Sequence, residues 1–363
     1  MIWYLYQKGL FGQLMNILDT TLRDGSYIVD FRFTLEDVKD IVNKAARLGI
    51  KYIEIGHGMG LGASGVDHGE ALFTDLEYID AANNYDVKYD SILGMFCIPG
   101  IAKINDLAIA REHGLSFIRI GFNATDYKSA VPYIREAKKQ GYIVMINLMK
   151  SYIISPAQFG EIAKCAEDEG VDVIYIVDSA GCMTSSDVEK YYGAISNNSC
   201  IKIGFHGHNN LGLAVNNTVH AIELGFDMVD CTFQGIGRSL GNASLEQTLM
   251  VLKRKGYDVD VDMACLLEYG YAALRNIVDV KLMHPLDLIC GYAGFHSGYI
   301  KQIYKCSIEK NVDPLRLILA YSELDKKELK YDKLLEVADG LPIDTNSNPY
   351  NFNIYFSERY SDV

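Results

Sequence analysis

Short apolar runs recur along the first two thirds of the chain, and helix-length segments separate them. These segments carry apolar residues at three- and four-residue intervals, as amphipathic helices do, and several close at a glycine such as Gly49 or Gly225. The pattern predicts eight strands that alternate with helices. The predicted strands are Asn16–Thr20, Tyr52–Gly56, Asp90–Phe96, Phe117–Phe122, Ile143–Leu148, Val171–Val177, Ile201–Phe205 and Met228–Phe233.

Alternating strands and helices require parallel crossover connections, and eight such units over roughly 230 residues match a (β/α)8 barrel in number and length. An open doubly wound sheet is the alternative, but no Gly-x-Gly-x-x-Gly motif follows the first strand. We therefore predict an α/β fold, a TIM barrel with a smaller C-terminal helical region. The predicted parts are an N-terminal extension (1–14), the catalytic barrel (15–250), the helical region (251–340) and a polar tail (341–363).

The predicted helical region contains two amphipathic segments, Met263–Asn276 and Gly298–Asn311. Between them lies the segment Gly291–His296, which we expect to reach back to the mouth of the barrel. The tail beyond Gly340 is polar and rich in turn-forming residues, so no regular structure is predicted for it.

Polar side chains follow the predicted strands, at the end of a barrel where active sites form. This distribution predicts that residues far apart in the sequence meet at one mouth. The residues are Arg23 and Asp24 after the first strand, His57 after the second, Asn123 after the fourth, Asn147 in the fifth, Asp178 and Ser179 after the sixth, His206 and His208 at the seventh, and Asn242 after the eighth.

A metal site is the strongest prediction from these residues. His206 and His208 are two positions apart on a strand, so their side chains share one face. Barrel closure makes the first strand a neighbour of the eighth, with the seventh on its other side, and this brings Asp24 to the two histidines. Asn242 converges on the same point, as a fourth oxygen donor or as a supporting group. Mixed nitrogen and oxygen ligands suit Mn²⁺, Co²⁺ or Zn²⁺.

Composition narrows the class of protein further. Lys and Arg number 34 against 47 Asp and Glu, and the net charge of −13 argues against a nucleic-acid or anionic-membrane partner. The eight cysteines form no Cys-x-x-Cys pair and lie mostly in apolar surroundings, as expected of reduced, buried thiols. The N-terminal residues form neither a convincing signal peptide nor a membrane span. We therefore expect a cytoplasmic protein.

The motif Asp19-Thr-Thr-Leu-Arg-Asp-Gly25, taken with His206-Gly-His-Asn209 and Gly241-Asn242, resembles a superfamily of barrel enzymes. These enzymes depend on a divalent metal and make or break carbon–carbon bonds next to a 2-oxo acid (DRE-TIM metallolyases). The chain is most similar to the 4-hydroxy-2-oxovalerate aldolases, over roughly residues 15 to 310. Three further segments carry that similarity: Gly56-His-Gly-Met-Gly-Leu-Gly62, Asp178-Ser-Ala-Gly-Cys-Met183 and Gly291-Tyr-Ala-Gly294.

The resemblance implies retro-aldol cleavage of a 4-hydroxy-2-oxo acid to pyruvate and an aldehyde, or the reverse reaction. It favours Mn²⁺ or Mg²⁺ as the cation and assigns Arg23 to stabilise the enolate oxygen. His57, Asn147 and Ser179 are predicted to contact the substrate. Lyases of the hydroxymethylglutaryl-CoA type carry a cysteine in the loop where this chain has Gly237-Arg-Ser-Leu-Gly241, and this disfavours that branch.

Two positions depart from the aldolase pattern. The aldolases have a histidine where this chain has Tyr27, and commonly a tyrosine where this chain has His296. We predict that the two side chains have exchanged roles, which leaves His296 as the base and Tyr27 as its hydrogen-bonding partner. The unperturbed pKa of histidine, about 6.5, suits a base, whereas that of tyrosine is about 10.

Two other readings stay open at this stage. A Claisen-type synthase would use acetyl-CoA and a 2-oxo acid, and the loop Gly235–Glu246 is similar to the corresponding loop of such synthases. A non-catalytic barrel would keep the metal and serve as a scaffold. Aldolases of this branch often work with an acylating aldehyde dehydrogenase, but the C-terminal region offers no clear match to a docking surface. We expect a homo-oligomer.

Overall fold

The computed structural model describes residues 16–84, 89–279, 282–325 and 328–343. The predicted N-terminal extension and most of the predicted polar tail lie outside them. Eight parallel strands form a closed barrel in the order β1 to β8, which confirms the predicted fold class. The strands are β1 Asn16–Asp19, β2 Tyr52–Ile55, β3 Ile92–Cys97, β4 Phe117–Asn123, β5 Ile143–Met149, β6 Val173–Asp178, β7 Lys202–Gly207 and β8 Met228–Cys231.

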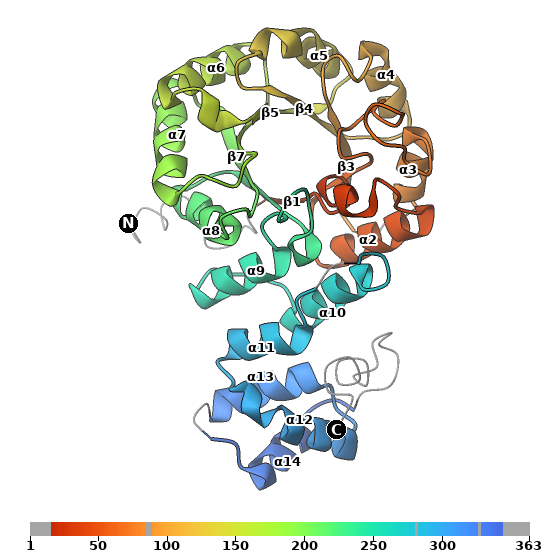
Figure 1. Cartoon of the computed structure of the whole chain (residues 1–363). Helices are drawn as coiled ribbons and strands as arrows, with labels where there is room; N and C mark the ends of the chain where they lie inside the picture. Colours follow the sequence, from red (N-terminus) through yellow and green to blue (C-terminus); the bar gives the residue numbers. More distant parts are fainter. Residues whose placement is uncertain (1–15, 85–88, 280–281, 326–327, 344–363) are drawn as a thin grey trace. The chain divides into compact units, whose positions relative to one another are not determined.

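Helices surround the strands, and Figure 1 looks along the barrel so that the helices form an outer ring. They begin at capping residues: Thr34 accepts from the backbone N–H of Asp37 at the start of α2, and Ser155 caps α6 in the same way. The barrel helices are α2 Leu35–Arg47, α3 Asp75–Ala82, α4 Ile104–Glu112, α5 Tyr127–Lys139, α6 Pro156–Asp168, α7 Ser185–Asn198, α8 Ala214–Leu224 and α9 Leu245–Arg254.

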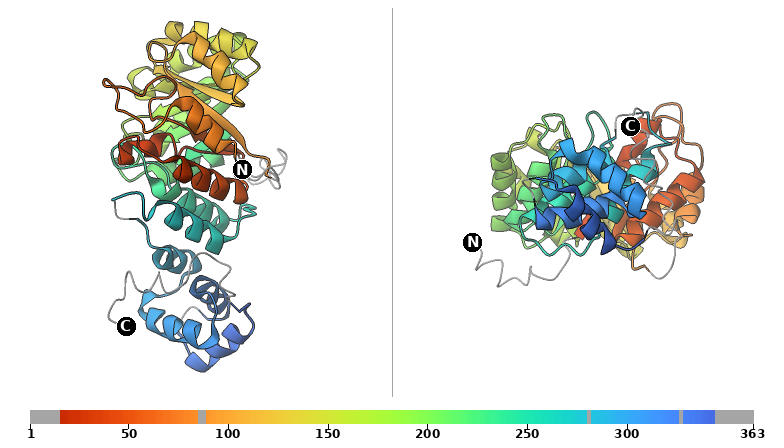
Figure 2. Two further views of the ribbon diagram at one scale, coloured as in Figure 1. Left: turned by 90° about the vertical axis from the view of Figure 1, so that its right-hand side faces the viewer. Right: turned by 90° about the horizontal axis from the view of Figure 1, so that it is seen from below.

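The pairing of β1 with β8 closes the barrel, with Asn16 opposite Met228 and Asp19 opposite Cys231. Figure 2 shows the strands from the side, inside their helices. Side chains from several strands fill the interior, as expected of a barrel that is a packed core and not a pore. They include Leu18, Phe117, Met145, Val173, Tyr175 and Met228, all buried.

The chain divides into two compact units, one ending at Asp260 and the other beginning at Val261. The second unit consists of helices that pack on one another: α10 Met263–Leu274, α11 Pro285–Ala293, α12 Ile300–Lys310, α13 Pro314–Leu324 and α14 Tyr331–Asp339. None of the helices in the described ranges has the length and apolar content to cross a membrane.

The cysteines differ in part from the prediction. All eight thiols are free, as expected, but Cys165, Cys182 and Cys200 are exposed. Cys165 lies on α6, and Cys182 and Cys200 lie in the connections before α7 and before β7, where side chains face water. The buried thiols are Cys97 and Cys231 at the ends of strands and Cys290 and Cys306 on helices of the second unit.

Candidate active site

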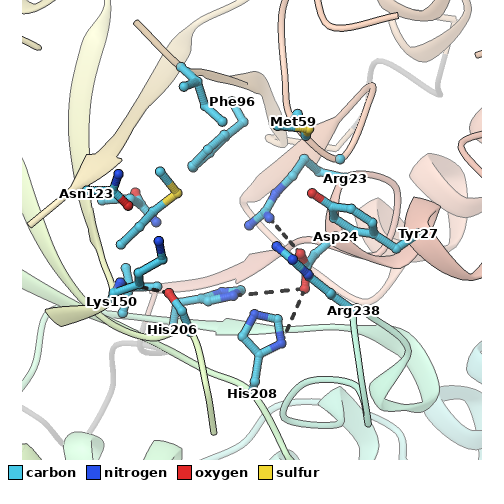
Figure 3. Close-up of a pocket in the computed structure, with 16 residues that line it drawn as sticks. Arg23, Asp24, Tyr27, Met59, Phe96, Asn123, Lys150, His206, His208 and Arg238 are labelled. Atoms are coloured by element: carbon cyan, nitrogen blue, oxygen red, sulfur yellow. Dashed lines mark hydrogen bonds and ion pairs between the residues drawn. The ribbon is translucent and has the colours of Figure 1, made fainter. Parts of the chain in front are cut away.

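The predicted metal ligands meet at the C-terminal ends of β1 and β7. Asp24 begins the short 3-10 helix η1 (Asp24–Val29), while His206 lies near the end of β7 and His208 directly after it. All three are buried, and one ligand atom from each lies within 4.8 Å of the others. His206 Nε2 and His208 Nδ1 are each 4.0 Å from Asp24 Oδ2 (Figure 3). Both nitrogens therefore face one carboxylate oxygen across a gap too wide for hydrogen bonds.

Two orphaned atoms indicate that this gap suits a cation. His208 Nδ1 and Asn242 Oδ1 are buried and have no hydrogen-bond partner in the described structure. Buried polar atoms without a partner are costly and rare. Asn242 Nδ2 donates to Asp24 Oδ2 at 2.5 Å, so the amide is anchored beside the carboxylate. A carboxylate, two imidazoles and an amide oxygen are a donor set that fits a divalent metal ion.

The protonation states also suit metal binding. Burial is the main cause that lowers the pKa of His208, to about 4, while Asp24 partly opposes it. Burial alone would raise the pKa of Asp24, but Arg23, the two imidazoles and Asn242 outweigh it and hold that pKa well below its usual range. At neutral pH the site therefore presents a carboxylate and a neutral His208, the forms that bind metals.

A series of buried, hydrogen-bonded charged side chains connects His206 to Asp24 through the barrel interior. His206 Nδ1 lies 2.7 Å from Asp230 Oδ2, Arg119 Nη2 donates to the same oxygen at 2.6 Å, and Arg119 Nη1 donates to Glu54 Oε2 at 2.9 Å. Arg23 completes the series, because its Nε donates to Glu54 at 2.7 Å and its Nη1 to Asp24 at 2.8 Å. Each charged side chain between Asp24 and His206 in this series thus contacts two other members of it.

Asp230 orients His206, because an ionised carboxylate at Nδ1 keeps the proton there and leaves Nε2 as the ligand atom. Burial would raise the pKa of Asp230, but Arg119 and His206 outweigh it and the pKa is lowered. Replacing Asp230 with Asn is expected to weaken Mn²⁺ binding about 10- to 100-fold in isothermal titration calorimetry. Asp227→Asn, an exposed position just before β8, is the matched control. Equal affinity in both variants would contradict an orienting role.

Arg23 is fixed in front of the triad. Its Nε and Nη1 are held by Glu54 and Asp24, and its guanidinium lies 4.8 Å from the centre of the Phe96 ring. The remaining nitrogen, Nη2, has no hydrogen-bond partner among the residues described. Arg23 also lines the pocket, so Nη2 is available to a substrate oxygen.

The pocket above the triad has a volume of about 260 Å³. Of the predicted substrate contacts, Asn147 and Ser179 line it. Both also serve the scaffold: Asn147 Oδ1 accepts from Arg119 Nε at 3.2 Å, and Ser179 Oγ accepts from the backbone N–H of Lys150 at 2.9 Å. Tyr27 lines the pocket too, half-buried, with its ring 5.0 Å from that of Phe31.

His57 was predicted to contact the substrate, but it is not among the residues that line the pocket. Its Nε2 lies 3.1 Å from the Gly69 carbonyl oxygen, and its Nδ1 accepts from the backbone N–H of Met59 at 3.1 Å. Its ring also stacks on Phe31 at 3.9 Å. His57 thus braces the loop that brings Gly58 and Met59 to the pocket.

His296 belongs to the second unit, where it caps the short 3-10 helix η4 (Ser297–Tyr299). Its Nδ1 accepts from the backbone N–H of Gly298 at 3.0 Å, and the side chain is exposed. The role predicted for His296 stays a prediction.

Sequence reasoning missed the supporting charges, although a signal for them exists. Glu54, Arg119 and Asp230 each interrupt an apolar strand. A charge inside a buried strand requires a charged partner, because an unpaired buried charge is too costly. Three such interruptions in different strands therefore indicate an internal ion network. Two cations in the pocket lining, Lys150 and Arg238, were also not predicted from the sequence.

The fold and the triad are those expected of the divalent-metal barrel enzymes that the sequence resembles. The profile of the HMGL-like family matches residues 14–271. The chain belongs to this family, which confirms the predicted resemblance.

Two relatives show the range of names among similar proteins. An oxaloacetate decarboxylase of Mycobacterium tuberculosis is 40% identical over 288 residues, which are 79% of this chain and 84% of that protein. A 4-hydroxy-2-oxovalerate aldolase of Carboxydothermus hydrogenoformans is 33% identical over 329 residues, 89% of this chain and 96% of that protein.

Solved structures share the fold at lower sequence identity. The HMG-CoA lyase of Bacillus subtilis aligns with a TM-score of 0.59 at 17% identity, over 75% of this chain and 97% of that one. The carboxyl transferase domain of Rhizobium etli pyruvate carboxylase, solved with pyruvate, aligns with a TM-score of 0.62 at 16% identity. That alignment covers 93% of this chain and 62% of the other.

Proposed function

We propose that the protein is a metal-dependent lyase that cleaves a 4-hydroxy-2-oxo acid between C3 and C4, giving pyruvate and an aldehyde. The observation that carries this proposal is Arg23, held rigidly beside the Asp24, His206 and His208 triad with one nitrogen unpaired. The relatives named 4-hydroxy-2-oxovalerate aldolase support it. Mn²⁺ is the first choice of cation, with Mg²⁺, Co²⁺ and Zn²⁺ as alternatives.

Cleavage leaves a pair of electrons on the pyruvate fragment, as an enolate. A cation held by Asp24, His206 and His208 supplies Lewis-acid stabilisation of that charge when bound. Arg23 adds a second positive group at the enolate oxygen through Nη2. Because Glu54 and Asp24 already hold the guanidinium, little reorganisation is needed as the charge develops. Phe96 and Met59 form an apolar wall of the pocket that limits access of water.

The reaction also needs a base for the C4 hydroxyl proton. Burial is the main cause that raises the pKa of Tyr27, so at neutral pH this side chain is a neutral hydrogen-bonding group. His296 is proposed as the base. Replacing His296 with Ala is expected to abolish aldol cleavage, measured as pyruvate release, while metal content by mass spectrometry stays normal. Retained turnover would refute the assignment.

Oxaloacetate decarboxylation is the second candidate reaction, and one observation favours it. Among the described lining residues, no histidine or carboxylate lies outside the triad, so the pocket by itself offers no base. Loss of CO₂ from C4 of oxaloacetate gives the same enolate and has no hydroxyl proton to remove. The relative at 40% identity supports this reaction. The His296→Ala variant separates the two, because decarboxylation should survive in it.

The first experiment follows exchange of the pyruvate methyl protons for deuterium by NMR, with Mn²⁺ and a His206→Ala control. It requires no knowledge of the second product. Exchange that depends on the metal and is lost in the control would support enolate chemistry. If the metal-loaded protein shows no exchange, the alternatives are the acetyl-CoA-dependent synthase and the non-catalytic barrel. Thiol release from acetyl-CoA in the presence of a 2-oxo acid would select the synthase.

A further inference from the structure

The pocket lining is strongly cationic for a chain of net charge −13. Three cations line it, Arg23, Lys150 and Arg238, and the only carboxylate among its described lining residues is Asp24. Arg23 is committed to Glu54 and Asp24. No ion pair of Lys150 or Arg238 occurs within the described residues. In an acidic protein, two unpaired cations at one small pocket indicate an anionic ligand.

Arg238 is carried by the loop that also anchors the metal site. This loop closes on itself, since the Asn242 N–H donates to the Gly235 carbonyl at 2.9 Å and the Gly241 N–H donates to the Arg238 carbonyl at 3.1 Å. Its base places Asn242 against Asp24, and its exposed part places Arg238 with the guanidinium carbon 5.5 Å from the centre of the Tyr27 ring. One loop thus couples the metal end of the pocket to a cation at its rim.

Lys150 follows β5 with its backbone in the left-handed conformation, at a φ of 57°. For a side chain other than glycine or asparagine this conformation is strained. The Ser179 hydroxyl compensates in part by accepting from the Lys150 N–H. Strain that the surroundings maintain is typical of functional sites. In the view of Figure 3, Lys150 and Arg238 flank the triad from opposite sides.

We infer that Arg238 and Lys150, on either side of the pocket, form a cationic rim that attracts a second carboxylate on the part of the substrate that departs from pyruvate, so that the substrates are 2-oxo dicarboxylates. The inference rests on the proposed function, in which the triad and Arg23 bind the 2-oxo end of the substrate. The second carboxylate then faces the two remaining cations that line the same pocket. A planar guanidinium can bind a carboxylate through two parallel hydrogen bonds, and the lysine adds a point charge.

Binding of an uncleaved ligand pair tests the inference independently of turnover. 2-Oxoglutarate carries the second carboxylate, whereas 5-methyl-2-oxohexanoate replaces it with an uncharged isopropyl group on a chain of the same length. Calorimetry on the Mn²⁺-loaded protein is expected to show roughly tenfold or greater preference for 2-oxoglutarate, the effect of one charge-assisted contact. The preference should decrease in Arg238→Gln and in Lys150→Gln, and should disappear in the double variant. Arg47→Gln, an exposed position at the end of α2, is the matched control and should keep it.

Equal affinity of the wild type for both ligands would overturn the inference, and so would a preference that survives in the double variant. The result is separable from the proposed function. If the pyruvate protons exchange but the two ligands bind equally well, only the proposed carboxylate subsite is refuted. If 2-oxoglutarate is preferred but the pyruvate protons do not exchange, the carboxylate subsite is supported and the proposed lyase reaction is refuted.

Discussion

Replacing Arg23 with Gln is expected to slow metal-dependent exchange of the pyruvate methyl protons about 10²- to 10³-fold. The magnitude is that of removing one preorganised group that stabilises an oxyanion. The neutral amide of Gln cannot supply the positive charge at the enolate oxygen, and it cannot satisfy Glu54 and Asp24 together while it also faces the substrate. Exchange is measured by NMR at saturating Mn²⁺ and pyruvate.

Saturating metal is essential to this experiment, because Arg23 also acts on a ligand. The guanidinium helps to lower the pKa of Asp24, so its loss should raise that pKa and make Mn²⁺ binding more sensitive to pH below neutrality. Titration calorimetry separates the two effects. Arg23→Lys, which keeps the charge but not the fork of donors, should recover part of the exchange rate. A loss explained entirely by metal content would show that Arg23 only supports the ligand set.

The sequence predicted the barrel well because both faces of its strands are buried, one under the surrounding helices and the other in the packed interior of the barrel. Such strands are continuous apolar runs, and their positions can be recognised without knowledge of their neighbours. The predicted run Phe117–Phe122 is one residue shorter than β4. Helix α5 contains Pro132, which removes one backbone hydrogen bond without ending the helix.

The triad was predictable for a similar reason, since β1, β7 and β8 must be neighbours once the barrel closes. The pairing within the network behind it was not, because Glu54, Arg119 and Asp230 come from β2, β4 and β8. Arg119 spans the barrel interior between the two carboxylates, and only the complete barrel shows that its side chain reaches both.

Loop residues were the least predictable part of the site. Gly56, at a φ of 93°, turns the chain after β2, so His57 points its nitrogens at loop backbone and not at the pocket. Lys150 and Ser239 also adopt positive φ values, which the sequence does not indicate for these residue types. The positions of the cations at the pocket rim, Lys150 and Arg238, could therefore be identified only from the folded structure.

Arg119→Met is expected to destabilise the metal-free protein by about 3–5 kcal/mol, the cost of leaving buried charges without their partner. Arg119 is fully buried, and its side chain pairs with Glu54 at 2.9 Å and Asp230 at 2.6 Å. Urea unfolding measures the change, without metal so that metal binding does not add to stability. Arg135→Met is the control, because Arg135 pairs with Glu169 at 2.6 Å on the surface. Its transition midpoint should hardly move, as expected of an exposed ion pair.

A second substitution tests whether the loss comes from charge and not from packing. In Arg119→Met, Glu54 keeps Arg23 as a partner, whereas Asp230 keeps His206 and loses its arginine partner. Adding Asp230→Asn removes the negative charge that has lost most of its compensation, so the double variant should be more stable than Arg119→Met alone. Lost packing against the Tyr175 ring, whose centre lies 4.3 Å from the Arg119 guanidinium carbon, would remain in both. Additive destabilisation by the two substitutions would show that shape, and not charge pairing, is the main contribution of Arg119.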